Sequence, residues 1–447
     1  MTKLYQARWV LPVSSPPIED GAIAVAGEQI VSVGPRSALV AQFTEATVLD
    51  LGESAIIPGL VNAHSHLELT AMRGFLEDEV ADFFAWLRKL TRARLDLMTA
   101  DDLEVSASWG ACEAVRAGVT CVADASDAAL QSMNALRDVG LRGIVFQESF
   151  GPDPQLAQEN FEKLTTKIAA LRERETSLVN GGVSPHAPYT VCARQLQMIS
   201  RFALDEKLPV MMHAAETEME VSFLREGRGP FADGLRSRGI EWHAPGVSTI
   251  QYLQDVGVLE TRPLLAHCIH VDEADLETIK QTGTRVAHCP KSNAKLGHGI
   301  APFARMIDKR IDVGLGSDSV ASNNTCDLLE EARFALLLSR SNGNCDLNCD
   351  HILRAATLGG AHSLGLAGKV GELKAGLQAD FAVVSLDGTH QIPSYGPAET
   401  LIFASSGRDV TMTVVAGREV YRDGRVMNVD EERLRARMNE IARKLRD

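Results

Sequence analysis

The sequence predicts an α/β fold, in which a TIM-like (β/α)8 barrel is joined to a small β-sandwich domain built from both chain ends. Three observations support this prediction. Short apolar runs recur eight times along the middle of the chain, and helical patterns follow most of them. The two ends of the chain differ from the middle, with short strand-like runs separated by turns. Several of the eight apolar runs also end in a histidine or an aspartate.

The eight apolar runs are typical of parallel strands that are buried on both faces. They are residues 56–63, 119–123, 141–147, 182–185, 209–213, 264–267, 285–288 and 313–316. Helical patterns between them cover residues 100–117, 154–174, 193–206, 272–281 and 301–308. An open doubly wound sheet would carry a glycine-rich phosphate turn after its first strand. This chain has His-Ser-His-Leu-Glu at that place, so we expect a closed barrel.

Both chain ends are β-rich, and we expect them to fold together into one small domain. The strand-like runs are residues 4–10, 21–26, 29–33, 380–384 and 410–415, and an amphipathic helix is expected over 430–444. The expected domains are a composite β-sandwich, residues 1–57 plus 370–447, and the (β/α)8 barrel, residues 58–369. The long segment 67–99 after the first barrel strand is a candidate substrate lid.

The composition excludes several classes of function. The chain has 447 residues and a formal net charge of -14, which disfavours nucleic acid or an anionic membrane as its main partner. No run approaches the roughly 18 apolar residues of a membrane span, and the N-terminus lacks the features of a signal peptide. The eight cysteines are scattered through apolar segments, as reduced thiols are in cytoplasmic proteins. We therefore expect a cytoplasmic protein that acts on a small molecule.

Polar residues stand at the C-terminal ends of five expected strands, where barrel enzymes keep their chemistry. They are His64 with His66, His213, His267, His288 and Asp318. A single histidine at the edge of an apolar run is more often an ordinary core residue, but that explanation would have to hold five times here. His64 and His66 are two residues apart, so they face the same side of their strand.

This set of residues predicts a metal site. Three imidazoles and one carboxylate suit Zn²⁺ or Fe²⁺ and leave an open position for water. We expect one divalent metal ion per chain, zinc with iron as the alternative, bound by His64, His66, His213 and Asp318. No lysine ends a strand in this set, so a carbamylated lysine between two metal ions is not supported.

The same strand ends supply candidates for acid–base catalysis. A divalent metal lowers the pKa of bound water to about 7, and Asp318 can accept the proton that this water releases. Glu216 follows the ligand His213 by three residues and can carry a proton to the substrate as a general acid. His267 can stabilise the attacking oxygen or a developing negative charge. We therefore expect Glu216, His267 and Asp318 to be catalytic.

These residues lie in segments that resemble the amidohydrolase superfamily, in particular its mononuclear aminohydrolase branch. The segments are Pro-Gly-Leu-Val-Asn-Ala-His64-Ser-His66, His213-Ala-Ala-Glu216-Thr, Ala-His267-Cys, His288-Cys-Pro-Lys-Ser-Asn293 and Gly-Ser-Asp318-Ser. The branch includes methylthioadenosine/adenosylhomocysteine, aminodeoxyfutalosine, guanine and cytosine deaminases and the triazine hydrolases. The similarity covers nearly the whole chain. It implies hydrolytic deamination of an aromatic ring, with Glu216 protonating a ring nitrogen, and it favours a homodimer or higher homo-oligomer.

The resemblance also implies residues that bind the substrate. The segment Ser-Pro-His186-Ala-Pro-Tyr is similar to the nucleoside deaminases, in which the matching histidine contacts the ribose. A plain helix-entry turn is the alternative interpretation of this segment. We expect His288 and Asn293 to hold the ring or to order the pocket. Glu68, two residues after the His-x-His motif, is also assigned to substrate binding.

Two departures from the adenosylhomocysteine-type enzymes bear on the substrate. Glu68 replaces part of a small or apolar pair, and residues 83–94 replace an Ile-Trp-Pro-x-Glu element whose glutamate grips the ribose hydroxyls. Both features look more like the aminodeoxyfutalosine deaminases, whose substrate ends in a benzoate. Trp86 would supply an aromatic wall, and Arg88 would bind the carboxylate in a bidentate manner. Arg88 and Arg92 are also spaced like the solvated face of an amphipathic lid helix.

We therefore expect a metal-dependent deaminase of a 6-aminopurine nucleoside derivative. The first candidate substrate is 6-aminodeoxyfutalosine, on the futalosine route to menaquinone. The alternatives are an S-adenosylhomocysteine/5′-methylthioadenosine deaminase, or a triazine or guanine hydrolase of the same branch. A non-catalytic binding relative would have lost metal ligands, and all the expected ligands are present here.

Overall fold

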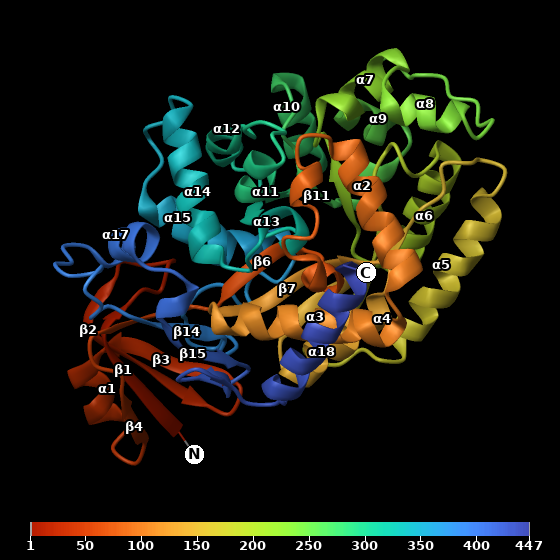
Figure 1. Ribbon diagram of the computed structural model, residues 1–447. Coiled ribbons are helices and arrows are strands. Elements are labelled where there is room, and N and C mark those ends of the chain that lie inside the picture. Colours follow the sequence, from red (N-terminus) through yellow and green to blue (C-terminus); the bar gives the residue numbers. More distant parts are fainter. Residues whose placement is uncertain (1, 447) are drawn as a thin grey trace.

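The computed structural model describes residues 2–446, which form a mixed α/β fold. In Figure 1 the N-terminal strands, in red, and the C-terminal strands, in blue, lie together on the left of the molecule. The middle of the chain forms a larger unit of parallel strands surrounded by helices. This arrangement confirms that the two β-rich chain ends fold together.

The chain ends build one nine-stranded sheet. Its strands are β1 (Thr2–Val10), β2 (Ile18–Ala26), β3 (Gln29–Pro35), β4 (Thr47–Asp50), β5 (Ser54–Pro58), β14 (Phe381–Ser385), β15 (Val410–Val415), β16 (Arg418–Arg422) and β17 (Arg425–Val426). Strand β5 joins the two ends, because it pairs with β1 in parallel and with β14 in antiparallel register. Tyr5 and Phe381 pack edge to face beneath this junction, with ring centroids 5.0 Å apart. A division into two facing sheets stays a prediction.

The middle of the chain builds two parallel four-stranded sheets. One has the order β6 (Leu60–Ser65), β7 (Val119–Ser126), β8 (Arg142–Ser149) and β9 (Val179–Pro185); the other has the order β10 (Met211–Ala214), β11 (Leu264–His267), β12 (Arg285–His288) and β13 (Val313–Leu315). Single parallel bridges link the sheets at both seams, Val183 to Val210 and Ser65 to Asp318. The eight predicted strands are therefore all present and parallel.

The prediction of a single first strand over residues 56–63 is wrong in one respect. The structure divides it at Gly59, so that Ile56 belongs to the terminal sheet while His64 belongs to β6. Proline lacks the backbone N–H that a continuous ladder would use at position 58. A side chain at position 59 would collide with Thr120, since its Cβ would lie 2.0 Å from the Thr120 hydroxyl oxygen. The Pro-Gly pair thus turns the chain from one sheet into the other.

Helices cover the parallel strands. The longer ones are α2 (Phe83–Arg92), α3 (Ala100–Arg116), α4 (Ala129–Val139), α5 (Ala157–Arg172), α6 (Ala193–Glu206), α7 (Glu218–Glu226), α10 (Glu273–Thr282), α14 (Leu328–Ser341) and α18 (Glu431–Arg446). Helix α18 lies beside α3 in Figure 1. Arg437 and Lys444 of α18 form ion pairs with Asp101 and Asp102 of α3, at 2.7 and 2.8 Å. The C-terminal helix is therefore anchored to the α/β unit.

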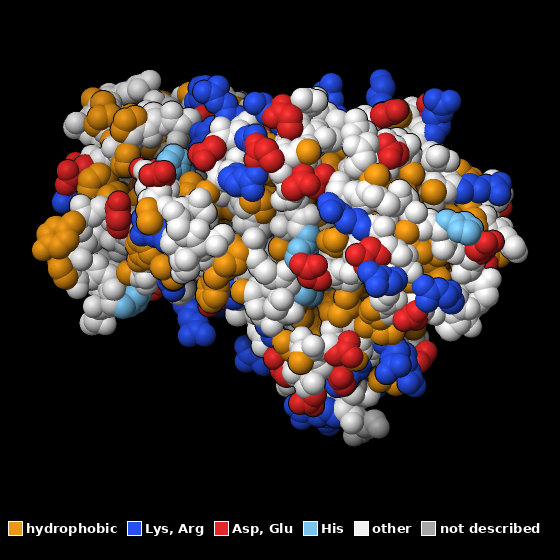
Figure 2. Space-filling model, turned by 90° about the horizontal axis from the view of Figure 1, so that it is seen from above, with side chains coloured by type: hydrophobic (Ala, Val, Ile, Leu, Met, Phe, Trp, Pro, Cys, Tyr) orange, Lys and Arg blue, Asp and Glu red, His pale blue; other side chains and the backbone are white. Residues whose placement is uncertain are grey.

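The surface carries charges of both signs. On the face shown in Figure 2, basic and acidic side chains are interspersed, and neither forms an extended area of one sign. A nucleic-acid-binding face would gather Lys and Arg to neutralise phosphates. Among residues 2–446, none of the helices is long and apolar enough to cross a membrane.

Candidate metal centre and active-site pocket

The predicted metal ligands converge where the parallel strands end. His64 and His66 lie at the end of β6, His213 lies in β10, and Asp318 follows β13. Atoms Nε2 of His66 and Nε2 of His213 are 3.2 Å apart. Asp318 Oδ1 lies 3.5 Å from His64 Nε2 and 3.6 Å from His66 Nε2. The structure thus brings together four side chains from three strands that are distant in sequence.

These side chains present lone pairs to one point. His213 Nδ1 lies 2.9 Å from the carbonyl oxygen of His186, which fixes the proton on Nδ1 and leaves Nε2 unprotonated. His64 Nε2 is buried and has no hydrogen-bond partner. Burial lowers the pKa of His64, His66 and His213 to about 4, so all three are neutral at pH 7. Neutral imidazoles with free lone pairs are competent ligands, and the set fits a divalent metal such as zinc.

Asp318 is held in one orientation by two serines. The hydroxyls of Ser292 and Ser322 donate to its Oδ2 at 2.5 and 2.8 Å, which leaves Oδ1 facing the histidines. Burial alone would raise the pKa of Asp318, but the neighbouring imidazoles hold it well below its usual value. The backbone of Asp318 is left-handed, with φ at 55°, and so is that of His267, with φ at 72°. Such strain is typical of side chains fixed for function.

Glu216 lies beside the predicted metal ligands and faces two further histidines. Its Oε1 is 3.7 Å from His267 Nε2 and 3.3 Å from His298 Nδ1. Burial would raise the pKa of Glu216, but the neighbouring imidazoles of His267 and His298 outweigh burial and lower it to about 2. Glu216 therefore carries a negative charge at neutral pH in the free protein. An ionised buried carboxylate can accept a proton and then return it to a substrate.

The turn that orients Glu216 is held in place by a second carboxylate, that of Glu220. Glu220 accepts hydrogen bonds from the backbone N–H groups of Ala215 at 2.8 Å and of Glu216 at 3.1 Å. The hydroxyl of Thr249 donates to the same carboxylate at 2.8 Å. Ala215 is itself left-handed, with φ at 52°, so the turn departs from regular strand geometry. Glu220 lies in the first turn of α7, is completely buried, and holds this turn in place through its hydrogen bonds.

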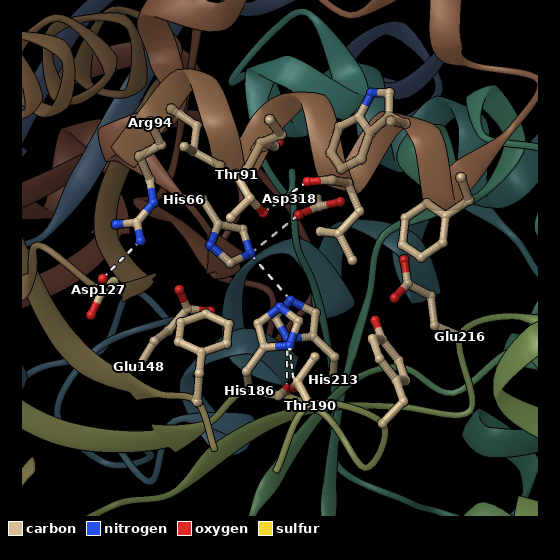
Figure 3. Close-up of a pocket in the computed structure, with 18 of the residues that line it drawn as sticks. His66, Thr91, Arg94, Asp127, Glu148, His186, Thr190, His213, Glu216 and Asp318 are labelled. Atoms are coloured by element: carbon tan, nitrogen blue, oxygen red, sulfur yellow. Dashed lines mark hydrogen bonds and ion pairs between the residues drawn. The ribbon is translucent and has the colours of Figure 1, made fainter. Parts of the chain in front are cut away.

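A cavity of about 460 Å³ opens from the metal centre towards α2. Figure 3 shows His66, His213 and Asp318 together near its middle, with Glu216 on one side and the Arg94–Asp127 pair on the other. Phe83, Trp86 and Leu90 of α2 form an apolar wall. A volume of this size suits a ligand of nucleoside dimensions. The predicted lid segment therefore does cover the pocket.

The assignment of Arg88 to the substrate does not fit the structure. Phe83, Trp86 and Leu90 follow one another at helical spacing and bury one face of α2. Arg88 lies on the opposite face, is exposed, and lines a separate surface hollow. Arg94, just past the end of α2, lines the active-site cavity instead. The segment does line the cavity as expected of a lid, but the phase of the helix turns Arg88 away from the cavity.

Two other predicted substrate contacts lie behind the cavity wall. His288 does not line the cavity; its ring stacks on Phe303, with centroids 4.8 Å apart. Asn293 Oδ1 accepts a hydrogen bond from His267 Nδ1 at 2.9 Å, so Asn293 orients a catalytic candidate. His288 therefore contacts Phe303 and Asn293 contacts His267, and neither lies on the cavity surface.

The remaining predicted contacts do line the cavity: Glu68, Trp86 and His186. The carboxylate of Glu68 is already paired within the protein, because it accepts hydrogen bonds from the hydroxyl of Ser126 and from the N–H of Ala128, the latter at 2.8 Å. Trp86 Nε1 is buried and has no hydrogen-bond partner. His186 lies next to the ligand His213, with ring centroids 4.7 Å apart. The aromatic and imidazole groups are therefore the better placed contacts for a ligand.

Sequence reasoning missed several residues of this pocket, namely Arg94, Asp127, Glu148 and His298. Glu148 lies at the end of β8, where the strand-end rule that identified His213 would also have found it. Arg94 lies in a π-helical turn, Ala93–Leu97, that continues α2, and His298 lies in an irregular segment; the sequence pattern reveals neither position. Burial and the nearby Glu68 raise the pKa of Glu148 well above its usual value.

Several known proteins are similar to this chain over nearly its whole length. It is 32% identical over 435 residues to a 5-methylthioadenosine/S-adenosylhomocysteine deaminase of Syntrophobacter fumaroxidans, covering 96% of this chain and 94% of that protein. A deaminase of the same name from Pelotomaculum thermopropionicum is 31% identical and covers 99% of this chain and 98% of its own. These relatives support the deaminase alternative rather than aminodeoxyfutalosine as the substrate.

Solved structures and a family profile agree with this relation. An adenosine deaminase from Xanthomonas campestris with bound zinc has a TM-score of 0.88 and 27% identity, and the match covers 99% of this chain and 98% of that one. The guanine deaminase of C. acetobutylicum has the same fold, with a TM-score of 0.80 at 21% identity, covering 94% of this chain and 100% of that one. Residues 55–420 match the profile of the amidohydrolase family. The chain belongs to the amidohydrolase family and is a hydrolase acting on C–N bonds.

Proposed function

We propose that this enzyme is a metal-dependent deaminase of 6-aminopurine nucleosides, with 5′-methylthioadenosine and S-adenosylhomocysteine as its substrates. The observation that carries this proposal is the site itself. Three neutral imidazoles and Asp318 meet at one point, and the buried, ionised Glu216 lies beside them on the wall of a nucleoside-sized cavity. The names of the relatives, at 31–33% identity over nearly the whole chain, support this substrate class.

The residues of the chain divide the reaction between them. His64, His66, His213 and Asp318 would hold the metal, which supplies a Lewis acid for the activation of water. Glu216 Oε1 accepts a proton from the attacking water and delivers it to a ring nitrogen of the purine, which makes the amino-bearing carbon more electrophilic. The proton of the added hydroxyl then passes to the amino group, which leaves as ammonia. His267, oriented by Asn293, donates a hydrogen bond to the oxygen that is added to that carbon. The wall formed by Phe83, Trp86 and Leu90 excludes bulk water from the ring.

The positions of two arginines remove our sequence-based reason for preferring aminodeoxyfutalosine. Our expectation of a benzoate depended on an arginine in residues 83–94. Arg88 faces away from the cavity, and Arg94 pairs with Asp127 at 2.7 Å and with Glu68 at 3.4 Å. Neither guanidinium is left to bind a carboxylate of the ligand. The methylthio group of 5′-methylthioadenosine needs no such partner. S-adenosylhomocysteine ends in an amino acid, and its carboxylate would need another cation, such as the guanidinium of Arg238, which also lines the cavity.

We infer three further properties that belong to the same proposal. The eight parallel strands close into a (β/α)8 barrel over residues 58–369, and residues 1–57 and 370–447 form the second domain. One zinc ion, or iron as the alternative, occupies the site in each chain. The enzyme acts on its small-molecule substrate as a homodimer or larger homo-oligomer. Metal analysis by mass spectrometry and light scattering of the purified enzyme test the last two points.

The deciding experiment is ammonia release by the metal-replete enzyme. The panel holds 5′-methylthioadenosine, S-adenosylhomocysteine, aminodeoxyfutalosine, guanine and a chlorotriazine, with chloride measured for the last. We expect the first two to be turned over with the highest kcat/KM. Asp318→Asn should abolish turnover, whereas Asp308→Asn, an exposed aspartate at the end of a helix, should leave it unchanged. Turnover of guanine or the triazine alone would refute the nucleoside assignment.

A further inference from the structure

One buried imidazole behind the cavity wall has no role in the reaction described above. His298 is 9% exposed and does not lie on the cavity surface. Within the described residues 2–446, neither of its ring nitrogens has a hydrogen-bond partner. Buried polar atoms in folded proteins nearly always have partners, and the exceptions include atoms with a catalytic role. His298 is therefore a candidate for a role in the reaction.

The group that His298 faces is the catalytic carboxylate. Its Nδ1 lies 3.3 Å from Oε1 of Glu216, which is close enough for a hydrogen bond, but the two groups are not aligned for one. Because Glu216 is ionised, its oxygens can only accept, and a nitrogen that binds them must carry a proton. Catalytic hydrogen bonds are often poorly aligned in a free enzyme and tighten when the ligand binds. A small rotation of the ring would complete this one.

The chain around His298 holds the residue in this place. His298 lies between Gly297 and Gly299, whose φ angles of 67° and 115° are left-handed values that favour glycine. The N–H of His298 donates to the carbonyl oxygen of Asn293 at 2.9 Å. The side chain of the same asparagine accepts from Nδ1 of His267. Asn293 thus fixes the ring of His267 and the backbone of His298, the two histidines beside the catalytic carboxylate.

The ring of His298 also meets the lid. Phe83, the first residue of α2, packs on it edge to face, with centroids 4.6 Å apart and an angle of 88° between the rings. Phe83 stacks in turn on Trp86, at 5.8 Å, and both aromatic side chains line the cavity. A ligand that packs against this wall restricts the movement of Phe83, and Phe83 then restricts the ring of His298. One imidazole therefore connects the lid to Glu216.

We propose that His298 is a positioning residue that couples the lid helix to the catalytic carboxylate. When a substrate packs against Phe83 and Trp86, the ring of His298 is held with its Nδ1–H directed at Glu216 Oε1. A carboxylate oxygen has two lone pairs, so Oε1 accepts this hydrogen bond and still exchanges a proton with water and with the purine. The inference rests on the proposed deaminase function and deepens it, because it names the group that orients Glu216 once the pocket is filled.

The test removes the two contacts of His298 separately. His298→Ala loses both, His298→Phe keeps a ring against Phe83 without a donor, and His298→Asn places an amide N–H near the position of Nδ1 without a ring. With 5′-methylthioadenosine, we expect His298→Ala and His298→Phe to lower kcat about 10- to 100-fold with little change in KM. His298→Asn should recover most of the lost kcat. The matched control is His243→Ala, since His243 is an exposed histidine beside an exposed glutamate.

A double-mutant cycle tests the link to the lid. Phe83→Leu should lower kcat in the wild type but should not lower it further in His298→Ala, because the lid acts through His298. Leu90→Ala is the control, since Leu90 lies at the other end of the same wall, and its effect should add to that of His298→Ala. Additive effects of Phe83→Leu and His298→Ala would refute the coupling.

The remaining outcomes separate this inference from the proposed function. A wild type that releases ammonia from none of the nucleosides refutes the proposed function, and this inference with it. An active wild type with an unchanged kcat in His298→Ala refutes the inference alone. Loss of bound metal from the His298 variants, measured by mass spectrometry, also refutes it, because the residue would then support the metal centre. The same holds for an equal loss of kcat in His298→Asn and His298→Phe, a comparison that decides even where His298→Ala does not fold.

Discussion

Replacing Glu220 by alanine tests whether the turn that carries Glu216 depends on its buried clamp. The substitution leaves the N–H groups of Ala215 and Glu216 without their acceptor. Each unpaired buried N–H costs about 1–3 kcal/mol, so we expect a loss of about 2–6 kcal/mol of unfolding free energy. With an unfolding entropy of about 2.1 cal/mol/K per residue, a chain of 447 residues loses about 1 °C of Tm per kcal/mol. The expected fall in Tm is therefore about 2–6 °C.

The same substitution should reduce catalysis, because Glu216 loses its fixed direction. Displacement of a catalytic group by about 1 Å costs on the order of 100-fold in rate. The assay pairs differential scanning calorimetry with steady-state ammonia release, at saturating substrate and metal. Glu226→Ala is the matched control, since Glu226 is an exposed glutamate of the same helix. Glu220→Ala with the Tm and kcat of that control would refute the clamp.

Three further predictions concern stability, the pocket and the metal. Asp380→Ala should destabilise the protein by about 3–5 kcal/mol, measured by urea unfolding, because Arg142 would lose its buried bidentate partner at 2.8 and 3.1 Å. Arg88→Ala should leave kcat/KM within twofold of wild type. Arg94→Ala should lower kcat/KM at least about tenfold, because the carboxylates of Asp127 and Glu68 would lose the cation that they share. Removal of the metal by a chelator should abolish ammonia release, and added zinc should restore it; full activity of a metal-free preparation would contradict the site.

The strand-end rule brought the predicted metal ligands together because parallel strands deliver their C-terminal residues to one edge. His64, His213 and Asp318 are far apart in sequence, yet each follows an apolar run whose direction is fixed by parallel pairing. Side-chain alternation then placed His64 and His66 on one side. The rule was applied to histidine and aspartate only, and so it passed over Glu148 at the end of β8.

The sequence predicts that residues 83–94 form a lid helix, but it does not predict which face of that helix meets the cavity. The aromatic and basic residues of 83–94 alternate with helical period, which predicts an amphipathic helix. Burial of Phe83, Trp86 and Leu90 fixes which face meets the cavity, and Arg88 is thereby turned to solvent. Composition alone pointed to an arginine that binds substrate. Only the phase of the helix against its neighbours decided which arginine enters the pocket.

The sequence by itself determined the class of chemistry. Four side chains of the type that zinc prefers, an adjacent glutamate and the eight-strand pattern are local properties of residue type and spacing. They can be recognised without coordinates. The tertiary structure decided what surrounds that chemistry. It paired Arg94 with Asp127 and Glu68, left Glu148 unpaired, and moved His288 and Asn293 behind the wall. These facts depend on distances between segments far apart in the chain, which no local pattern encodes.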